Sequence, residues 1–328
     1  MSMLADIISA AVMFAIPLLL VALGGMFSER SGVINIALDG IMVIGALISC
    51  LTLKFIDKAG YGAAHPIISM LIAVLVAAAA GAVFSLLLAF ASVTLKADQT
   101  IGGTALNQLA PAFAILLTWA IQGQGQTTIL IPTWTRLTEA SFGIEPLPEL
   151  LSKLLFKNLY ITTPIALIIL IVSWVVLYKT PFGLRLRACG EHPQAADSVG
   201  INVHKMRYIG VVISGVLGGI GGLAYTVAAG SGFQSSVAGY GFLALAVMIF
   251  GNWKPFNILG ASLFFALFKV IGSYADNIPF LPKFTGLKAK EYVYLMLPYI
   301  VTMIVLILTS KKSAAPKAEG IPYDKGQR

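Results

Sequence analysis

The sequence predicts an all-α, polytopic membrane protein with about nine transmembrane helices, within a range of roughly eight to ten. Of its 328 residues, 58% are hydrophobic and 11% are charged, whereas about 25% of the residues in a soluble domain are charged. Mean hydropathy is +0.89, and uncharged stretches repeatedly reach the roughly 20 residues that cross a bilayer core. These stretches are continuous and do not alternate, which predicts helices and not barrel strands. The composition excludes a soluble globular enzyme.

Charged residues mark the ends of the predicted crossings in chain order. The stretch between Asp6 and Glu29 is too long for a signal peptide and lacks its basic N-terminal region, so it is predicted as the first crossing. The longest uncharged stretch lies between Arg207 and Lys254 and is interrupted at 230–232, which predicts two crossings there. The predicted crossings are residues 7–28, 33–53, one within 59–95, one within 99–135, 158–178, two within 208–253, 257–274 and 292–308.

The charge distribution predicts the orientation of the chain. The net charge is +8, from 22 basic and 14 acidic residues, and in a membrane protein such an excess indicates orientation, so no nucleic-acid partner is expected. Basic residues gather in the loop 179–207 and in the C-terminal tail. We therefore expect a membrane domain over residues 1–310 that includes this cytoplasmic loop. Residues 311–328, which are polar and lack an apolar face, are expected to form a disordered cytoplasmic tail.

The sequence shows no site for nucleotide, metal or covalent chemistry. It contains no Gly-Lys dipeptide, so a P-loop is impossible, and it contains no GxSxG sequence and no metal-binding histidine spacing. Cys50 and Cys189 do not form a CxxC motif. No cofactor, metal ligand or catalytic residue is expected. Asp39 is the single carboxylate clearly inside a predicted crossing, which disfavours a proton-coupled secondary carrier.

The predicted cytoplasmic loop contains a candidate docking element. A polar start at Glu191, Pro193 in the first turn and Gly200 as terminator predict a short helix. Ala195 and Ala196 have small side chains that permit the close approach of another protein. The alternative is an ordinary solvated loop.

Polar residues inside the predicted crossings are candidates for a solute pathway, because a polar group in lipid is costly unless it is paired or faces a cavity. Asn35 and Asp39 are four residues apart, on one face of the second predicted crossing. An equally supported interpretation is that Gly32 and Gly40 flank a break in the helix, with the Asp39 carboxylate as an internal cap.

Two further groups of polar residues lie in predicted crossings or between them. Asn107 and Gln108 precede Pro111, and because helical neighbours differ by about 100° in direction, one of the two is expected to face the pathway. Residues 228–242 are rich in glycine and serine, which predicts either an unwound stretch lining a cavity or a plain outer loop. The candidates there for stacking and hydrogen bonding to a flat polar solute are Phe233, Gln234 and Tyr240.

Two remaining features are interpreted structurally. The pairs Gly215/Gly219 and Gly218/Gly222 predict close helix packing within the subunit, with a homodimer face as the alternative. Lys269 is expected to extend its side chain toward the membrane interface and is given no role.

Three stretches of the sequence resemble one known family of membrane proteins. Residues 183–225, GLRLRACGEHPQAADSVGINVHKMRYIGVVISGVLGGIGGLAY, are similar to the coupling region of the permeases of ABC transporters that import branched-chain amino acids, ribose and nucleosides. The family's first-repeat signature resembles residues 29–49, ERSGVINIALDGIMVIGALIS, where Asp39 replaces the Glu that is usual in the nucleoside branch. Residues 100–113, TIGGTALNQLAPAF, also resemble that branch.

The resemblance implies a type II-like importer permease of the bacterial inner membrane, with nucleosides as the cargo. Separate ABC ATPase subunits would hydrolyse ATP, so this chain would be a transport subunit and not an enzyme. A second permease subunit, related or identical, would complete the pore, and a substrate-binding lipoprotein or periplasmic protein would deliver the solute. By the same resemblance, the residues that contact the ATPase are Gly190, Glu191, His192, Ala195, Ala196, Gly200 and Ile201. Alternatives are a permease for simple sugars or branched-chain amino acids, a secondary carrier, and a membrane-embedded enzyme.

Overall fold

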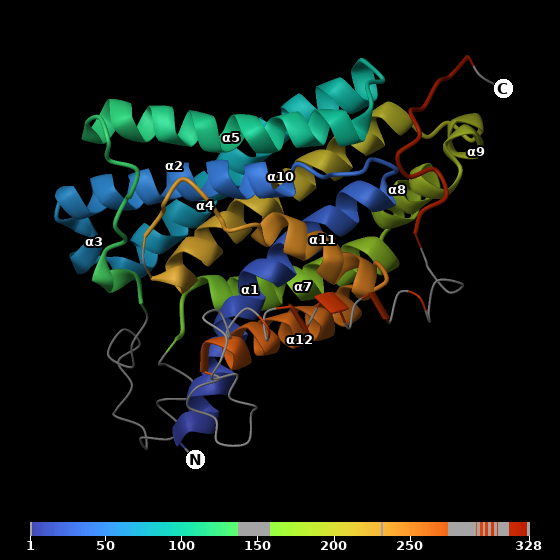
Figure 1. Ribbon diagram of the computed structural model, residues 1–328. Coiled ribbons are helices and arrows are strands. Elements are labelled where there is room, and N and C mark those ends of the chain that lie inside the picture. Colours follow the sequence, from blue (N-terminus) through green and yellow to red (C-terminus); the bar gives the residue numbers. More distant parts are fainter. Residues whose placement is uncertain are drawn as a thin grey trace.

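The protein is a bundle of long helices, as the computed structural model in Figure 1 shows. The structure describes residues 2–136, 158–230, 232–274 and 315–326, with isolated positions from 293 to 307. Within these residues, seven helices are long and apolar enough to cross a membrane. They are α1 (Ser2–Arg30), α2 (Leu38–Lys58), α4 (Pro66–Ala89), α5 (Gln99–Gln122), α7 (Thr162–Lys179), α10 (Val203–Ala229) and α12 (Pro255–Tyr274).

Shorter elements connect the long helices. They are α3 (Tyr61–Ala64), a π-helical turn η1 (Phe90–Thr94), a 3₁₀ turn η2 (Thr133–Thr135), α8 (Pro181–Glu191), α9 (Pro193–Ser198) and α11 (Tyr240–Phe250). The predicted polytopic helical fold is confirmed, whereas the number of nine crossings is not. The predicted last crossing, 292–308, lies largely outside the described residues.

The stretch 208–253 differs from the prediction of two full crossings. It contains the long helix α10 and the 11-residue helix α11. Eleven residues rise only about 16 Å, which is half of a bilayer core of about 30 Å. The described residues that precede α11, 230 and 232–239, are not helical. This segment therefore consists of an unwound stretch followed by half a helix.

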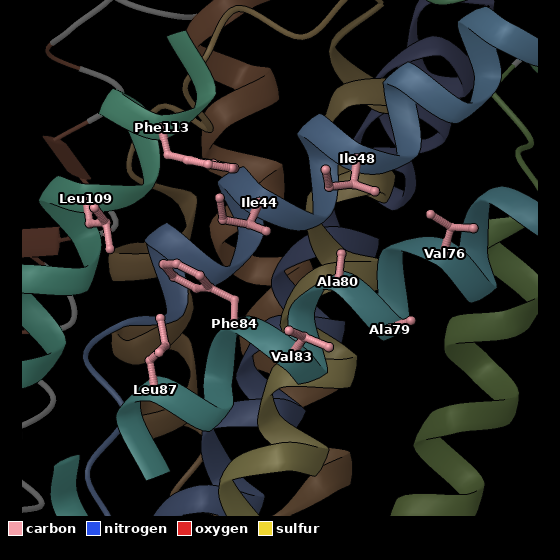
Figure 2. A pocket seen from close by; sticks show the side chains of 10 residues that line it. All are labelled: Ile44, Ile48, Val76, Ala79, Ala80, Val83, Phe84, Leu87, Leu109 and Phe113. Carbon is pink, nitrogen blue, oxygen red and sulfur yellow. The ribbon is translucent and has the colours of Figure 1, made fainter. Parts of the chain in front are cut away.

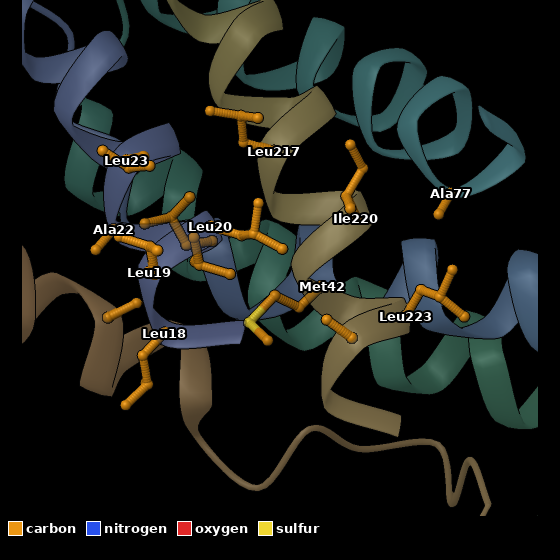
Figure 3. Close-up of a cluster of buried hydrophobic side chains, with 14 of the residues drawn as sticks. Leu18, Leu19, Leu20, Ala22, Leu23, Met42, Ala77, Leu217, Ile220 and Leu223 are labelled. Carbon is orange, nitrogen blue, oxygen red and sulfur yellow. The ribbon is translucent and has the colours of Figure 1, made fainter. Parts of the chain in front are cut away.

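Helix α10 lies at the centre of the bundle and packs on α1, α2 and α4 through glycines. A Cβ atom at Gly219 would lie 2.1 Å from the carbonyl oxygen of Ala77, and one at Gly222 would lie 2.0 Å from that of Met42. The predicted close packing within the subunit is confirmed at these positions. Figure 3 shows buried apolar side chains of α10 beside those of α1, α2 and α4. The labelled residues are Leu18, Leu19, Leu20, Ala22, Leu23, Met42, Ala77, Leu217, Ile220 and Leu223.

The two ends of the bundle differ in what they carry (Figure 1). One end, at the right in the figure, carries α8, α9 and the C-terminal residues, and we call it the α9 end. The opposite end carries α3 and the loop after α5, and we call it the α3 end. The candidate site described next lies between these ends and at the α9 end.

Candidate functional site

The connection between α1 and α2, residues 31–37, is an unwound segment inside the bundle. Helix α1 ends at Arg30, where the Gly32 N–H donates to the Glu29 carbonyl at 2.8 Å and Gly32 adopts a φ of +94°. This left-handed conformation favours glycine. Asn35 lies in the unwound segment and not in α2, so the predicted helical face shared by Asn35 and Asp39 is wrong. The break near Gly32, which was the other interpretation, is present.

Side chains of α5 bind the backbone of this connection. Gln99 Oε1 accepts a hydrogen bond from the Ile34 N–H at 2.7 Å. Asn107 Nδ2 donates to the Ile36 carbonyl at 2.8 Å, and Asn107 Oδ1 accepts from the Gly40 N–H at 2.7 Å. Gln99 and Asn107 are eight residues apart on α5, which corresponds to a rise of about 12 Å. The connection therefore runs from the α9 end to the middle of the bundle, and side chains of α5 supply hydrogen-bond partners to its backbone.

Asn107 and Gln108 diverge as expected for helical neighbours. Asn107 is buried, and its amide group binds Ile36 of the α1–α2 connection and Gly40 in the first turn of α2. Gln108 is exposed on the other side of α5. Asn107 thus holds the break in place, and Gln108 is the one of the two whose side chain is free to face a solute.

Asp39 joins the two broken segments. It lies in the first turn of α2, and its Oδ1 accepts a hydrogen bond from the Gly241 N–H at 2.9 Å, in the first turn of α11. The carboxylate therefore stands at the N-termini of two helices, where negative charge is stabilised. A Cβ atom at Gly241 would lie 2.2 Å from the Asp39 backbone nitrogen, so this close approach requires glycine. Asp39 caps a helix 202 residues away, and not the break in its own segment.

The three candidates in the unwound stretch 230–239 and at its end point in different directions. Phe233 is fully buried and forms a β-bridge with Ile129, with N–O distances of 2.9 Å both ways. Gln234 is exposed. Tyr240 is buried at the start of α11, and its hydroxyl accepts a hydrogen bond from Lys269. Phe233 therefore fastens this stretch to the loop after α5, and Tyr240 faces a cavity.

Lys269 does not extend toward the membrane interface as expected. Its ammonium turns inward to the Tyr240 hydroxyl and lies 4.2 Å from the centre of the Tyr240 ring. The ring of Phe14 on α1 is 4.5 Å away. The sequence showed a lysine in an apolar stretch, and no pattern in the sequence indicated that aromatic rings from three other helices would surround it.

A second hollow, between α2, α4 and α5, is wholly apolar (Figure 2). Its volume is about 650 Å³. Its walls are the side chains of Ile44, Ile48, Val76, Ala79, Ala80, Val83, Phe84, Leu87, Leu109 and Phe113. It offers a polar solute no hydrogen-bonding side chain, so we do not place the pathway there.

At the α9 end, the predicted short helix is confirmed as α9, and Gly200 follows it with a φ of +84°. The basic segment before it, which we expected to be loop, forms the helix α8. A groove of about 690 Å³ lies beside α9, between α8 and the start of α10. Arg185 and Lys205 contribute to its lining.

The residues assigned to the coupling contact fall into three groups by exposure. His192, Ala195 and Gly200 are exposed, and Glu191 and Ile201 are half-buried. Gly190 and Ala196 face the interior of their own subunit, with Ala196 only 3% exposed. Val199 was not singled out in the sequence, yet it is 75% exposed. The sequence did contain a signal for Val199, because it is a large apolar residue directly before the glycine that terminates a short helix.

The C-terminal end of α8 packs on the end of α1. A Cβ atom at Gly190 would lie 2.4 Å from the Arg30 carbonyl oxygen. The Arg30 guanidinium is 3.8 Å from the Glu191 carboxylate, and its Nη2 donates to the Trp253 carbonyl at 3.3 Å. The Trp253 Nε1–H donates to Glu29 Oε2 at 2.6 Å. The segment that leads into α9 therefore contacts the residue at which α1 unwinds.

Residues 315–326 also lie against this end, which differs from the disorder expected for residues 311–328. The Ala318 N–H donates to the Gly190 carbonyl at 2.8 Å, and the Gly320 N–H donates to the Gly32 carbonyl at 3.3 Å. These bonds use backbone groups, which any sequence possesses. A composition without an apolar face therefore does not exclude this kind of docking.

Side chains complete the attachment of residues 315–326. Arg207 Nη1 donates to the Ile321 carbonyl at 2.8 Å, and Lys96 forms an ion pair with Asp324 at 3.0 Å. This ion pair holds the pKa of the exposed Asp324 carboxyl below its usual range. Burial raises the pKa of Glu319. The tail thus contacts both α8 and the α1–α2 connection.

Comparison with known proteins gives one family and several full-length relatives. The family model of the branched-chain amino acid transport system permease component matches residues 7–308. The guanosine ABC transporter permease protein NupQ of Bacillus subtilis is 43% identical over 99% of this chain and 98% of its own length. The nucleoside ABC transporter permease protein NupC of Lactococcus lactis is 39% identical over 98% and 97%. A putative glucose ABC transporter permease protein of Haloferax volcanii is 30% identical over 80% and 76%. No solved structure matches significantly.

Replacing Asn107 by leucine is expected to destabilise the α1–α2 connection. The substitution leaves the Gly40 N–H and the Ile36 carbonyl without partners, and an unpaired buried polar group costs about 1–3 kcal/mol. The measurement is the thermal unfolding midpoint of the purified chain in detergent. The matched control is Gln108→Leu at the exposed neighbouring position, which we expect to leave the midpoint unchanged. Equal midpoints for the two variants would contradict the role given to Asn107.

Removal of residues 315–328 is expected to expose Cys189 to alkylation. This thiol is buried beside Arg207, and burial raises its pKa to about 11, so at neutral pH it is protonated and reacts slowly. Without Ile321, Arg207 loses its bond to the tail. We expect labelling by a maleimide in a Cys50→Ser background to accelerate about tenfold or more. A chain that lacks only residues 327–328 is the control. Unchanged labelling of the longer truncation would show that the tail does not stabilise this end.

Proposed function

This chain belongs to the family of branched-chain amino acid transport system permeases, and from that premise we propose that it is the membrane-spanning subunit of an ATP-driven nucleoside importer. The observation that carries the proposal is the similarity along nearly the whole chain to permeases named for guanosine and nucleosides. As a permease it is a transport component and not an enzyme. Its sequence has no P-loop, which agrees with ATP hydrolysis by separate ATPase subunits.

We place the α9 end in the cytoplasm. The basic residues of α8 and of the start of α10 gather there, in agreement with the excess of Lys and Arg in cytoplasmic loops. The attached residues 315–326 then also lie on the cytoplasmic side. The substrate-binding protein would approach the α3 end from outside the cell.

The proposed contact with the ATPase is the exposed face of α9. The exposed residues there are Ala195 on α9 and, at its two ends, His192, Val199 and Gly200. The small side chain of Ala195 permits the close approach of a partner. The inward-facing Gly190, which packs closely on the Arg30 carbonyl, and the buried Ala196 would hold this helix against the bundle. Of the residues that the sequence assigned to coupling, the exposed ones are proposed to touch the partner and the buried ones to hold the helix.

Coupling is proposed to run from α9 to the unwound segment. Movement of α9 and α8 would act on Arg30 through the close packing of Gly190 and the ion pair with Glu191. Arg30 is the last residue of α1, directly before the connection to α2. A displacement there changes the position of Asp39 relative to α11, and the two halves of a permease pair would thereby alternate access.

The proposed solute pathway lies at the junction of the two broken segments. Asp39 and Tyr240 stand at the junction, and Gln108 and Gln234 are exposed on the neighbouring α5 and on the unwound stretch. Asn35, Asn107 and Phe233 are assigned to holding the unwound segments in place, because their side chains are buried in the subunit and the Asn35 amide donates to Ser214 Oγ of α10. A simple sugar is the second candidate cargo, on the evidence of the Haloferax volcanii relative.

The cargo is tested by uptake in a strain that lacks this chain. Re-expression of the chain is expected to restore ATP-dependent accumulation of labelled guanosine, with competition by other nucleosides and none by glucose or leucine. Restored accumulation of glucose with no nucleoside uptake would overturn the proposed cargo while keeping the transporter class. Accumulation by the purified chain alone in liposomes would overturn the class.

The contact on α9 is tested with Ala195→Glu. Adding bulk and negative charge to this exposed position is expected to reduce co-purification of the ATPase subunit at least tenfold, because the close approach is lost. The unfolding midpoint of the chain is expected to stay the same. Leu130→Glu, at an exposed position of the α3 end, is the control that retains the ATPase. Ala196→Glu is a contrasting variant, because a charge at this buried position is expected to unfold the chain. Full retention of the ATPase by Ala195→Glu would exclude α9 as the docking helix.

A further inference from the structure

Lys269 is a charged residue inside a membrane-spanning helix, in the half of α12 nearer the α3 end. Its ammonium lies among the rings of Phe14, Tyr225 and Tyr240, at 4.5, 5.9 and 4.2 Å from their centres. Attraction to aromatic faces offsets part of the cost of removing a cation from water. A lysine in such a place is expected to have a partner or to face a cavity.

The described residues supply Lys269 with few polar partners. An ammonium has three N–H donors, and the Tyr240 hydroxyl accepts one of them. Among the residues that the structure describes, no carboxylate forms an ion pair with Lys269. Asp39, whose Oδ1 accepts a hydrogen bond from the Gly241 N–H, forms no ion pair with Lys269 among the described residues. Within the part of the chain that the structure describes, Lys269 thus has donor capacity beyond its hydrogen bond to Tyr240.

Lys269 also lines a cavity of about 200 Å³ between α11 and α12. The walls are the rings of Tyr240, Phe265 and Tyr299 and the side chain of Leu243. Ala238 and Gly239, the last residues of the unwound stretch, close one side. Aromatic walls with a few placed hydrogen-bonding groups are typical of small-molecule sites. The cavity is smaller than the roughly 300–1,000 Å³ of a complete ligand pocket, so it suits part of a solute.

The cavity adjoins the junction of the two broken segments. Tyr240 is the first residue of α11, and the next residue, Gly241, donates its backbone N–H to Asp39 of α2. A continuous series of contacts therefore runs from Lys269 through Tyr240 to Asp39. Discontinuous helices of membrane transporters place their ends at solute sites, because unwound backbone is tolerated where it lines a cavity.

We propose that Lys269 and Tyr240 form a subsite of the solute pathway, in which the Lys269 ammonium donates a hydrogen bond to an oxygen acceptor of a neutral, ring-containing solute. The rings of Tyr240 and Tyr299 contact the flat face of that solute. This subsite rests on the proposed function, and it assigns to the permease itself a part in choosing the cargo. The acceptor is a hydroxyl or carbonyl oxygen, as found on the ribose and base of a nucleoside.

The test uses the complete transporter, with ATPase and binding protein, in proteoliposomes. Uptake is compared for guanosine and for analogues that each lack one oxygen: 2′-deoxy, 3′-deoxy, 5′-deoxy and 6-deoxo. Lys269→Met is expected to lower guanosine uptake about 10–100-fold, which corresponds to one hydrogen bond to a charged group. One analogue is expected to be transported equally by the unaltered transporter and by Lys269→Met, because its contact is already missing. Lys269→Arg keeps a donor and is expected to retain the preference for guanosine.

A structural role for Lys269 predicts a different outcome. Lys269→Met would then lower the uptake of guanosine and of every analogue by the same factor, and that result would overturn the subsite. If Lys269→Met does not fold, Tyr299→Ala serves in its place, since Tyr299 is 50% exposed and its loss leaves the core intact. It is expected to raise the KM for guanosine without changing the unfolding midpoint. An unchanged KM would also overturn the subsite. Absence of guanosine uptake by the unaltered transporter contradicts the proposed cargo and not the subsite geometry.

Discussion

The structure depends on satisfying unwound backbone inside a membrane. Residues 31–37 and 232–239 leave N–H and carbonyl groups without helical partners, and lipid offers none in return. Gln99 and Asn107 of α5 supply acceptors and a donor to the first segment, and Asp39 accepts from the start of α11. Three polar side chains thereby make it possible for two helices to begin in the middle of the bundle. An uninterrupted helix at either place would leave no junction for a solute to approach.

The α9 end shows how a surface element is connected to that junction. Gly190 lies against Arg30 at the end of α1, and the tail residues 318 and 320 bind the carbonyls of Gly190 and Gly32. Each contact is a close backbone approach or a backbone hydrogen bond, so little side-chain rearrangement intervenes between α9 and the unwound segment. Rigid contacts of this kind transmit displacement more directly than flexible side chains do.

The sequence predicted the class of fold and the position of α9 from local signals, namely charge-free lengths and Pro and Gly spacing, and the break near Gly32 was one of its two interpretations of that segment. It could not predict partners that are distant in the chain. The interpretation with a break made Asp39 a cap of its own segment, whereas Gly241 is the donor. Asn107 was a pathway candidate because nothing local shows that both its amide atoms bind residues 36 and 40. Ala196 was assigned to coupling for its small side chain, and that side chain is buried within its own subunit. The packing of Lys269 among rings of three helices is equally non-local.

The attachment of residues 315–326 affects the order in which contacts form during biosynthesis. A membrane protein is inserted as the ribosome releases it, N-terminal helices first, yet Gly32 and Gly190 receive hydrogen bonds from residues 320 and 318. The contacts of Gly32 and Gly190 with these residues therefore form only after every long helix that the structure describes has been synthesised. A polypeptide cut short before residue 315 would enter the bilayer with all its described long helices and still lack these hydrogen bonds. The α9 end is in this way the last part of the described bundle to be completed.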